Sequence, residues 1–276
     1  MASNMKSRVK GVLAAVIITL ASGLLGSCGS SKPALTLSAE DRYKEGRKKF
    51  LDGDYLEAIN EFEVVKLQFT GSTVADSAQF YLGECHYKRE EFLLAAEEFQ
   101  NLRRNFPTSP LVPLAQHNIA MCYYNLSPKS YLDQKYTARA IDEFQTFIEY
   151  YPKSDLVHDA EAKIQELDAR LAEKEYNTAE LYMKLERYKA ATYYYNSVVE
   201  KYHDSPFAEP ALLGKIRSLM ARKKYDEAKP DVEKFLDKYP QSKYKSEVES
   251  VRRDINDHLQ SDSADVSRQQ QIPPPR

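Results

Sequence analysis

The hydrophobic positions of this chain follow one pattern that occurs five times. Each copy contains an alanine, a large apolar residue four positions later, and another apolar residue three positions after that. Residues spaced by four and three lie on one face of an α-helix, so each copy predicts a helix with one apolar stripe. The small alanine allows a partner helix to come close. The five alanines are Ala58, Ala95, Ala140, Ala191 and Ala228.

The end of each predicted helix has a second shared signal. In every copy an aromatic residue is followed three positions later by a serine. In three copies the residue after the aromatic is Pro107, Pro152 or Pro240, which ends a helix because proline lacks the backbone N–H. We expect each serine to cap the start of the next helix. The pairs are Phe69 and Ser72, Phe106 and Ser109, Tyr151 and Ser154, Tyr202 and Ser205, and Tyr239 and Ser242.

These signals predict an all-α fold, a right-handed superhelix of about five helix pairs. Each pair buries its apolar face only by stacking on its neighbours. We expect an extra amphipathic helix at 155–172, a polar capping helix at 243–260 and a disordered Gln- and Pro-rich tail at 261–276. The five units are expected at 38–71, 72–108, 109–153, 173–204 and 205–241.

The second unit resembles the tetratricopeptide repeat (TPR). Leu82 and Gly83 in its first helix, and Ala95, Phe99 and Pro107 in and after its second, occupy consensus positions at consensus spacings. The consensus tryptophan is absent, since the chain contains no Trp. Successive alanines lie further apart than the about 34 residues of a TPR. We therefore expect insertions within the third unit and between the third and fourth.

The first residues predict an export signal that ends at a cysteine. Three basic residues precede an apolar stretch at 12–25, which fits a secretory signal better than a membrane span. The stretch ends in Leu-Gly-Ser-Cys at 25–28, which resembles the bacterial lipobox. We expect a lipoprotein signal peptide at 1–27 and a diacylglycerol and acyl lipid on Cys28, whose thiolate is the nucleophile that accepts the lipid.

The alternative is an ordinary signal peptide with a chance cysteine near its cleavage site. The lipoprotein interpretation also predicts a flexible tether at 28–37 and folded structure from Ser38, which with Asp41 can cap a helix. In the enterobacterial lipoproteins that the segment resembles, aspartate after the cysteine retains the protein in the inner membrane, whereas Gly29 permits transfer. We expect a protein anchored by its lipid in the outer membrane of a Gram-negative bacterium, facing the periplasm.

Charge and motifs argue against several kinds of function. The net charge of -2 and the pI of about 6.3 provide no basic excess for nucleic acid. No HExxH, CxxC, GxSxG or phosphate-binding loop occurs, so we expect neither an enzyme nor a cofactor or metal site. Cys85 and Cys122 take equivalent positions on stacked helices, which lie about 10 Å apart. A disulfide needs a Cα separation below about 7 Å, so we expect two reduced core cysteines.

The first helix of each unit is expected to form the inner surface of the array. By helical phase, this surface combines apolar, aromatic and charged side chains, which suits an extended peptide or a helix. Core packing explains any one of these residues about as well. The candidate peptide-groove residues are Tyr43, Arg47, Phe50, Phe80, Glu84, Tyr87, His117 and Tyr124.

A lipobox followed by five such units is similar to the family of outer-membrane β-barrel assembly lipoproteins called BamD, ComL or YfiO. The resemblance implies a subunit of the barrel assembly machine that helps insert barrels into the outer membrane. Its C-terminal units would dock on the POTRA region of the barrel subunit. Its N-terminal units would receive unfolded outer-membrane proteins, whose targeting segment typically ends in an aromatic residue. The resemblance covers 38–260 and is sharpest at 71–84, 106–109, 140–144 and 167–175.

Two alternatives remain open from the sequence. A TPR lipoprotein that pilots secretin or pilus assembly shares the fold but has a different client. A lipoprotein that acts as a cell-wall enzyme cofactor or binds a substrate belongs to a different class. One basic docking position associated with the barrel-assembly family is Glu200 here, so no specific docking residue carries over.

Overall fold

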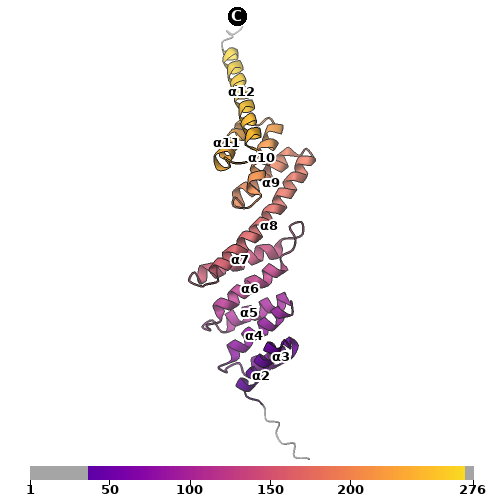
Figure 1. The fold of residues 1–276 in the computed structure, drawn as a ribbon, viewed down its shortest axis with the longest axis vertical. Helices are drawn as coiled ribbons and strands as arrows, with labels where there is room; N and C mark the ends of the chain where they lie inside the picture. Colours follow the sequence, from indigo (N-terminus) through magenta and orange to yellow (C-terminus); the bar gives the residue numbers. More distant parts are fainter. Residues whose placement is uncertain (1–36, 271–276) are drawn as a thin grey trace, which may run out of the picture.

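The computed structural model describes residues 37–270, which contain eleven α-helices and no strand. The helices stack along one long axis, from α2 at one end to α12 at the other (Figure 1). The predicted all-α fold of stacked helix pairs is confirmed. The pairs are α2 (Ala39–Asp52) with α3 (Tyr55–Gln68), α4 (Ala75–Lys88) with α5 (Phe92–Asn105), α6 (Val112–Leu126) with α7 (Lys135–Tyr150), α8 (Val157–Lys184) with α9 (Tyr188–Lys201), and α10 (Ala208–Ala221) with α11 (Tyr225–Lys238), followed by α12 (Lys245–Gln270).

The first helix begins where the sequence predicts. The Ser38 side chain accepts a hydrogen bond from the backbone N–H of Asp41 at 3.1 Å, which satisfies one of the free donors at the start of α2. At the other end of the units, Phe106, Tyr151 and Tyr239 are the C-cap residues that directly follow their second helices, and each stands directly before one of the three prolines. The local signals for starting and stopping helices therefore operate as expected at these positions.

The serines between units do not cap helices, so that prediction is wrong. The Ser109 hydroxyl accepts from the Leu111 N–H at 3.2 Å, and the Ser109 carbonyl accepts from the Val112 N–H at 3.1 Å. Ser154 makes the same side-chain bond to the Leu156 N–H at 3.3 Å. Ser109 and Ser154 stabilise a turn, and the following helices α6 and α8 begin only after that turn.

The core of each unit depends on close contact between its two helices. Phe62 and Phe99 are fully buried, and each ring lies against a glycine of the first helix. A Cβ atom on Gly46 or Gly83 would lie 2.7 Å from the facing ring. Because that distance is below van der Waals contact, glycine is what lets the aromatic stripe reach the partner backbone at these positions.

A carboxylate recurs three positions after the alanine, which the sequence reasoning did not identify. Four of the five units have it, and in each the carboxylate faces a cation from a neighbouring helix. The fourth unit instead has Tyr194. The four pairs are Glu61 with Lys49 (2.7 Å), Glu98 with Lys66 (2.7 Å), Glu143 with Arg103 (3.6 Å) and Asp231 with Lys215 (2.9 Å).

The extra helix expected at 155–172 is not separate. It joins the first helix of the fourth unit in one continuous helix, α8, because no glycine or proline interrupts this segment. Ala160 and Leu167 pack into the cluster formed with α6 and α7, whereas Ala172 and Ala179 pack into the cluster formed with α9 and α10. The helix therefore belongs to the cores of both halves of the array.

The insertion in the third unit is the loop between α6 and α7, and α8 holds this loop in place. Arg170 donates to the carbonyl of Ser127 at 3.0 Å and to its hydroxyl at 2.7 Å. Lys174 donates to the carbonyl of Leu132 at 2.7 Å. The longer loop thus gains fixed contacts with the helix that links the two halves.

The capping helix is longer than predicted. Val248 and Ile255 bury α12 against the last core cluster. The helix then continues to Gln270, because 261–270 contains no glycine or proline. The predicted disordered tail is therefore helical over its first part. Residues 271–276 lie outside the described residues, as do the predicted signal peptide, Cys28 and the tether up to residue 36. Among the described helices, none is both long and apolar enough to cross a membrane.

Candidate peptide-binding groove

An aromatic cluster with a cation over it lies where α2 meets α4. Tyr81 is its centre: the Phe50 ring centroid lies 5.3 Å from that of Tyr81, and the Tyr43 centroid lies 6.2 Å away. The Arg47 guanidinium carbon stands 3.8 Å from the Tyr81 ring centroid, a close cation–π contact. All four side chains are half-buried. The cluster can therefore offer ring faces and a positive charge to a ligand.

A series of polar contacts, here called the polar ladder, continues this surface from α4 to α8. Asn118 donates to the Glu84 carboxylate at 2.6 Å, and Asn125 donates to the Tyr87 hydroxyl at 2.8 Å. The Tyr124 hydroxyl then donates to Glu166 of α8 at 2.6 Å. Each contact joins first helices of consecutive units. The aromatic cluster and the polar ladder together make up one surface of the first helices, here called the groove because it has the chemistry to hold an extended polypeptide.

The Glu84 carboxylate is the most strongly desolvated acid of the polar ladder. Burial raises the pKa of Glu84, and Lys88 lowers it to a smaller extent. Because the pKa is higher in the folded chain than in the unfolded chain, the free energy of unfolding falls as pH rises through the interval between the two values. At neutral pH the ionised Glu84 therefore costs stability.

We expect Glu84→Gln to raise the free energy of unfolding at pH 7 and to change it little at pH 4. The amide remains neutral at both pH values and can still accept from Asn118. Urea unfolding at the two pH values measures the effect. Glu91→Gln is the matched control, because Arg89 and His86 lower the pKa of Glu91 to about 2. The Glu91→Gln variant should be less stable than the native chain at pH 7. A higher free energy of unfolding for this variant at pH 7 would contradict the assignment of opposite pKa shifts to Glu84 and Glu91.

The assignment to the groove is wrong for two of the predicted residues, Phe80 and His117. Phe80 is 5% exposed and packs on Phe99 with ring centroids 5.5 Å apart. His117 is 7% exposed and lies between the rings of Phe144 and Phe147, at 5.7 and 5.3 Å. A first helix packs against second helices on two sides, so its buried stripe is wider than the single stripe assumed from phase. Both side chains contribute to the core.

The other predicted residues lie on the groove, and the structure adds Tyr81, Asn118, Asn125 and Glu166. Tyr81 could have been found from the sequence, because it precedes Glu84 by three residues and thus shares its helix face. The asparagines and Glu166 had no such signal. Their roles depend on contacts with residues more than thirty positions away along the chain.

The two cysteines of the described chain are buried and free, as predicted. Burial raises the pKa of Cys85 to about 12 and raises that of Cys122 as well. Thiols with raised pKa values are poor nucleophiles. Within residues 37–270, no group of three His, Cys, Asp or Glu side chains could hold a metal ion.

Comparison with known proteins places the chain among outer-membrane lipoproteins. The family model described as "YfiO: Outer membrane lipoprotein" matches residues 36–223, and a tetratricopeptide-repeat model matches 210–242. The outer membrane protein assembly factor BamD of Pasteurella multocida (strain Pm70) is 23% identical over 205 residues, which cover 71% of this chain and 79% of that protein.

Solved structures of repeat proteins are also similar. The TPR2AB-domain:pHSP90 complex of yeast Sti1 aligns with a TM-score of 0.40 and 15% identity, over 84% of this chain and 96% of that chain. A tetratricopeptide repeat protein from Parabacteroides merdae ATCC 43184 aligns with a TM-score of 0.35 and 15% identity, over 83% and 76%. The YfiO match covers more than half of the chain, from before α2 to after α10. The chain therefore belongs to the YfiO family of outer membrane lipoproteins.

Proposed function

We propose that this protein is a lipid-anchored periplasmic scaffold for the assembly of outer-membrane β-barrel proteins. Family membership and the assembly-factor relative support this role. The groove on α2, α4, α6 and α8 is the observation that carries it, because ring faces, a cation and a row of polar groups suit an extended client segment. In this proposal the lipid on Cys28 holds the scaffold at the outer membrane.

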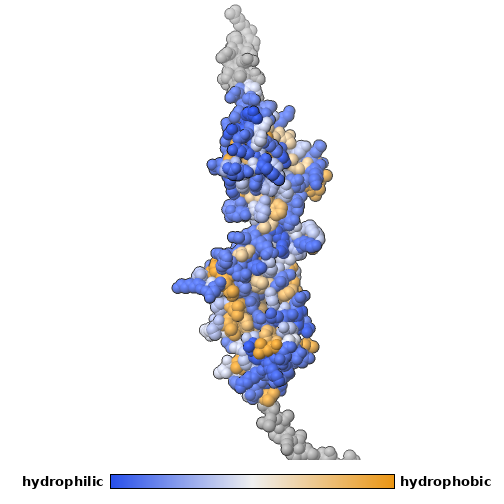
Figure 2. Space-filling view, in the orientation of Figure 1, coloured by the Kyte–Doolittle hydropathy of each residue, from blue (hydrophilic) through white to orange (hydrophobic). Residues whose placement is uncertain are grey.

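The distribution of apolar surface supports client binding in the first half of the array. Most of the exposed large hydrophobic side chains in the described chain lie before α8, among them Leu51, Leu67 and Leu93. Figure 2 shows hydrophobic surface gathered mainly over this half, whereas the part around α12 is mostly hydrophilic. An unfolded barrel protein exposes apolar side chains, so the first half provides the more suitable surface.

The proposal assigns the C-terminal units to the POTRA region of the barrel subunit. The two halves have separate core clusters that meet only along α8. In such arrays each unit contacts its neighbours alone, so the surfaces at the two ends can differ without changing the core. Clients and the barrel subunit could then be bound at the same time.

Exchanging Arg47 and Tyr87 for alanine is expected to weaken binding of a client-derived peptide. Both side chains contribute to the groove and neither is fully buried. If the peptide stacks on this surface, the pair should cost about 1–3 kcal/mol of binding free energy. The measurement is a fluorescence titration with a peptide that ends in an aromatic residue and a free carboxylate.

Two comparisons make this test specific. Tyr150→Ala, which removes a 70% exposed ring from a second helix outside the groove, should leave peptide binding unchanged. The Arg47 and Tyr87 double variant should still co-purify with the barrel subunit from membranes. If it loses both the peptide and the barrel subunit, one shared surface replaces the two-ended arrangement.

A further inference from the structure

The fourth unit departs from the others at the position where they have a buried or half-buried carboxylate. Tyr194 takes that position, and its ring stacks on Tyr182 of α8, with centroids 5.4 Å apart and planes 10° from parallel. Tyr193 meets the Tyr194 ring edge-on at 5.3 Å and is 70% exposed. Three tyrosines thus form an aromatic surface where the other units have an ion pair.

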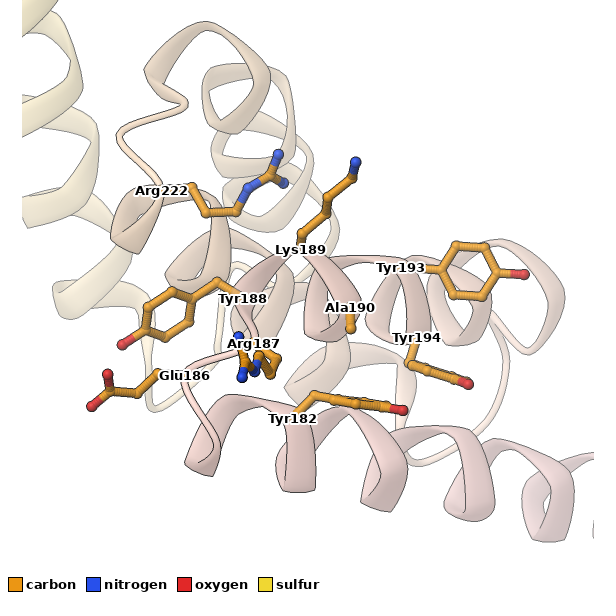
Figure 3. A pocket seen from close by; sticks show the side chains of 9 residues that line it. All are labelled: Tyr182, Glu186, Arg187, Tyr188, Lys189, Ala190, Tyr193, Tyr194 and Arg222. Carbon is orange, nitrogen blue, oxygen red and sulfur yellow. The ribbon is translucent and has the colours of Figure 1, made fainter.

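This surface is part of an open, shallow pocket of about 920 Å³, here called the tyrosine pocket. The end of α8, the turn after it, the start of α9 and the first residue after α10 form its walls. In Figure 3 the rings of Tyr182 and Tyr194 lie one over the other along one side, and Lys189 and Arg222 extend on the opposite side. The pocket therefore has an aromatic side and a cationic side.

The cations of the tyrosine pocket lack acidic partners. Arg187, Lys189 and Arg222 form no ion pair with any described residue, and Arg222 makes only a long 3.4 Å hydrogen bond to the Thr192 hydroxyl. In the fifth unit the residue in register with Arg187 is Lys224, and it pairs with Glu227 at 3.3 Å. Glu186 also lines the pocket but forms no ion pair with these three cations, so the lining keeps an excess of positive charge where the repeat carboxylate is absent.

We propose that the tyrosine pocket binds an extended acidic segment of another protein in which an aromatic residue stands between two carboxylates. The aromatic side chain packs on the Tyr182, Tyr193 and Tyr194 rings, where offset and edge-on contacts are favourable. The flanking carboxylates pair with the cations of the pocket, Arg187, Lys189 and Arg222. The pocket begins at Tyr182 near the end of α8, whereas the groove reaches α8 only at Glu166, so this interaction does not rest on the client-binding proposal.

The probe is the blocked peptide acetyl-Gly-Asp-Phe-Glu-Gly-amide, extended by a fluorescent label and titrated into the folded chain at about 50 mM salt. We expect saturable binding that weakens as salt rises, because exposed charge pairs are screened. Changing both Arg187→Gln and Lys189→Gln should lower the affinity about fivefold to tenfold, as expected for two exposed ion pairs. Tyr193→Ala should lower it by a similar factor.

Matched controls decide between the proposal and nonspecific attraction. Lys224→Gln, in the same register of the fifth unit, should not change the affinity. The neutral peptide with Asn-Phe-Gln should bind at least tenfold more weakly. Equal binding of the neutral peptide, or an equal loss in the Lys224 variant, would overturn the proposal. A second control peptide has no internal acidic residue and ends in phenylalanine with a free carboxylate. If only this peptide binds, the pocket recognises a chain end, and the proposal is also overturned. Circular dichroism must show unchanged helicity for each variant.

Discussion

Phe99→Ala is expected to lower the free energy of unfolding by about 3–5 kcal/mol. The ring is fully buried, packs on Phe80 and covers Gly83, where no other side chain can fill the vacated space. Because each unit depends on its neighbours, this loss should also weaken the stacking of units one and three on unit two. Urea unfolding followed by circular dichroism measures it as a lower midpoint.

Leu93→Ala is the matched control for this prediction. Leu93 lies on the same helix, α5, but is 52% exposed. Its removal should change the free energy of unfolding by no more than about 0.5 kcal/mol. Comparable losses for both variants would show that stability depends on the helix as a whole rather than on the contact between Phe99 and Gly83.

Cys28→Ala is expected to abolish lipid labelling and attachment to the outer membrane. The thiol of Cys28 is the predicted acceptor of the lipid, and alanine offers no nucleophile. Several acyl chains on one residue hold a protein at a bilayer, and none of the described helices provides a span to replace them. Membrane fractionation with radioactive palmitate should find the variant unlabelled, either as unprocessed precursor or in the soluble fraction.

Cys85→Ala serves as the control, because Cys85 is buried and free in the folded array. This variant should incorporate palmitate and remain in the membrane fraction. If Cys28→Ala is still processed and stays in the outer membrane, the lipoprotein interpretation is wrong, and the ordinary signal peptide becomes the better explanation.

Only some of the groove residues could be predicted from the sequence. Helical phase assigned Tyr43, Arg47 and Glu84 to the inner face of the first helices, and the structure shows all three as half-buried. It failed for Phe80 and His117, because phase locates a side chain around its own helix and does not say how many neighbours cover it. The hydrogen-bond partners in the polar ladder could not be predicted from the sequence either, because they come from helices of other units.

The sequence by itself determined the pairing of the helices, the start of α2 and the ends of α5, α7 and α11. Ala95 and Phe99 are both fully buried, as their spacing predicted. Ser38 caps α2, and the three prolines follow the ends of their helices. These features depend on residues within one or two turns of each other, so the local pattern carries them.

Only the tertiary structure decided what happens between units. It showed that α8 is continuous and shared by two cores, that the repeat carboxylates pair with neighbouring helices, and that Tyr194 stacks on Tyr182. A tyrosine in place of a carboxylate is a small change in a sequence. It becomes a pocket only because α8, α9 and the end of α10 converge there. Contacts of this kind depend on the packing of whole helices, which local spacing does not specify.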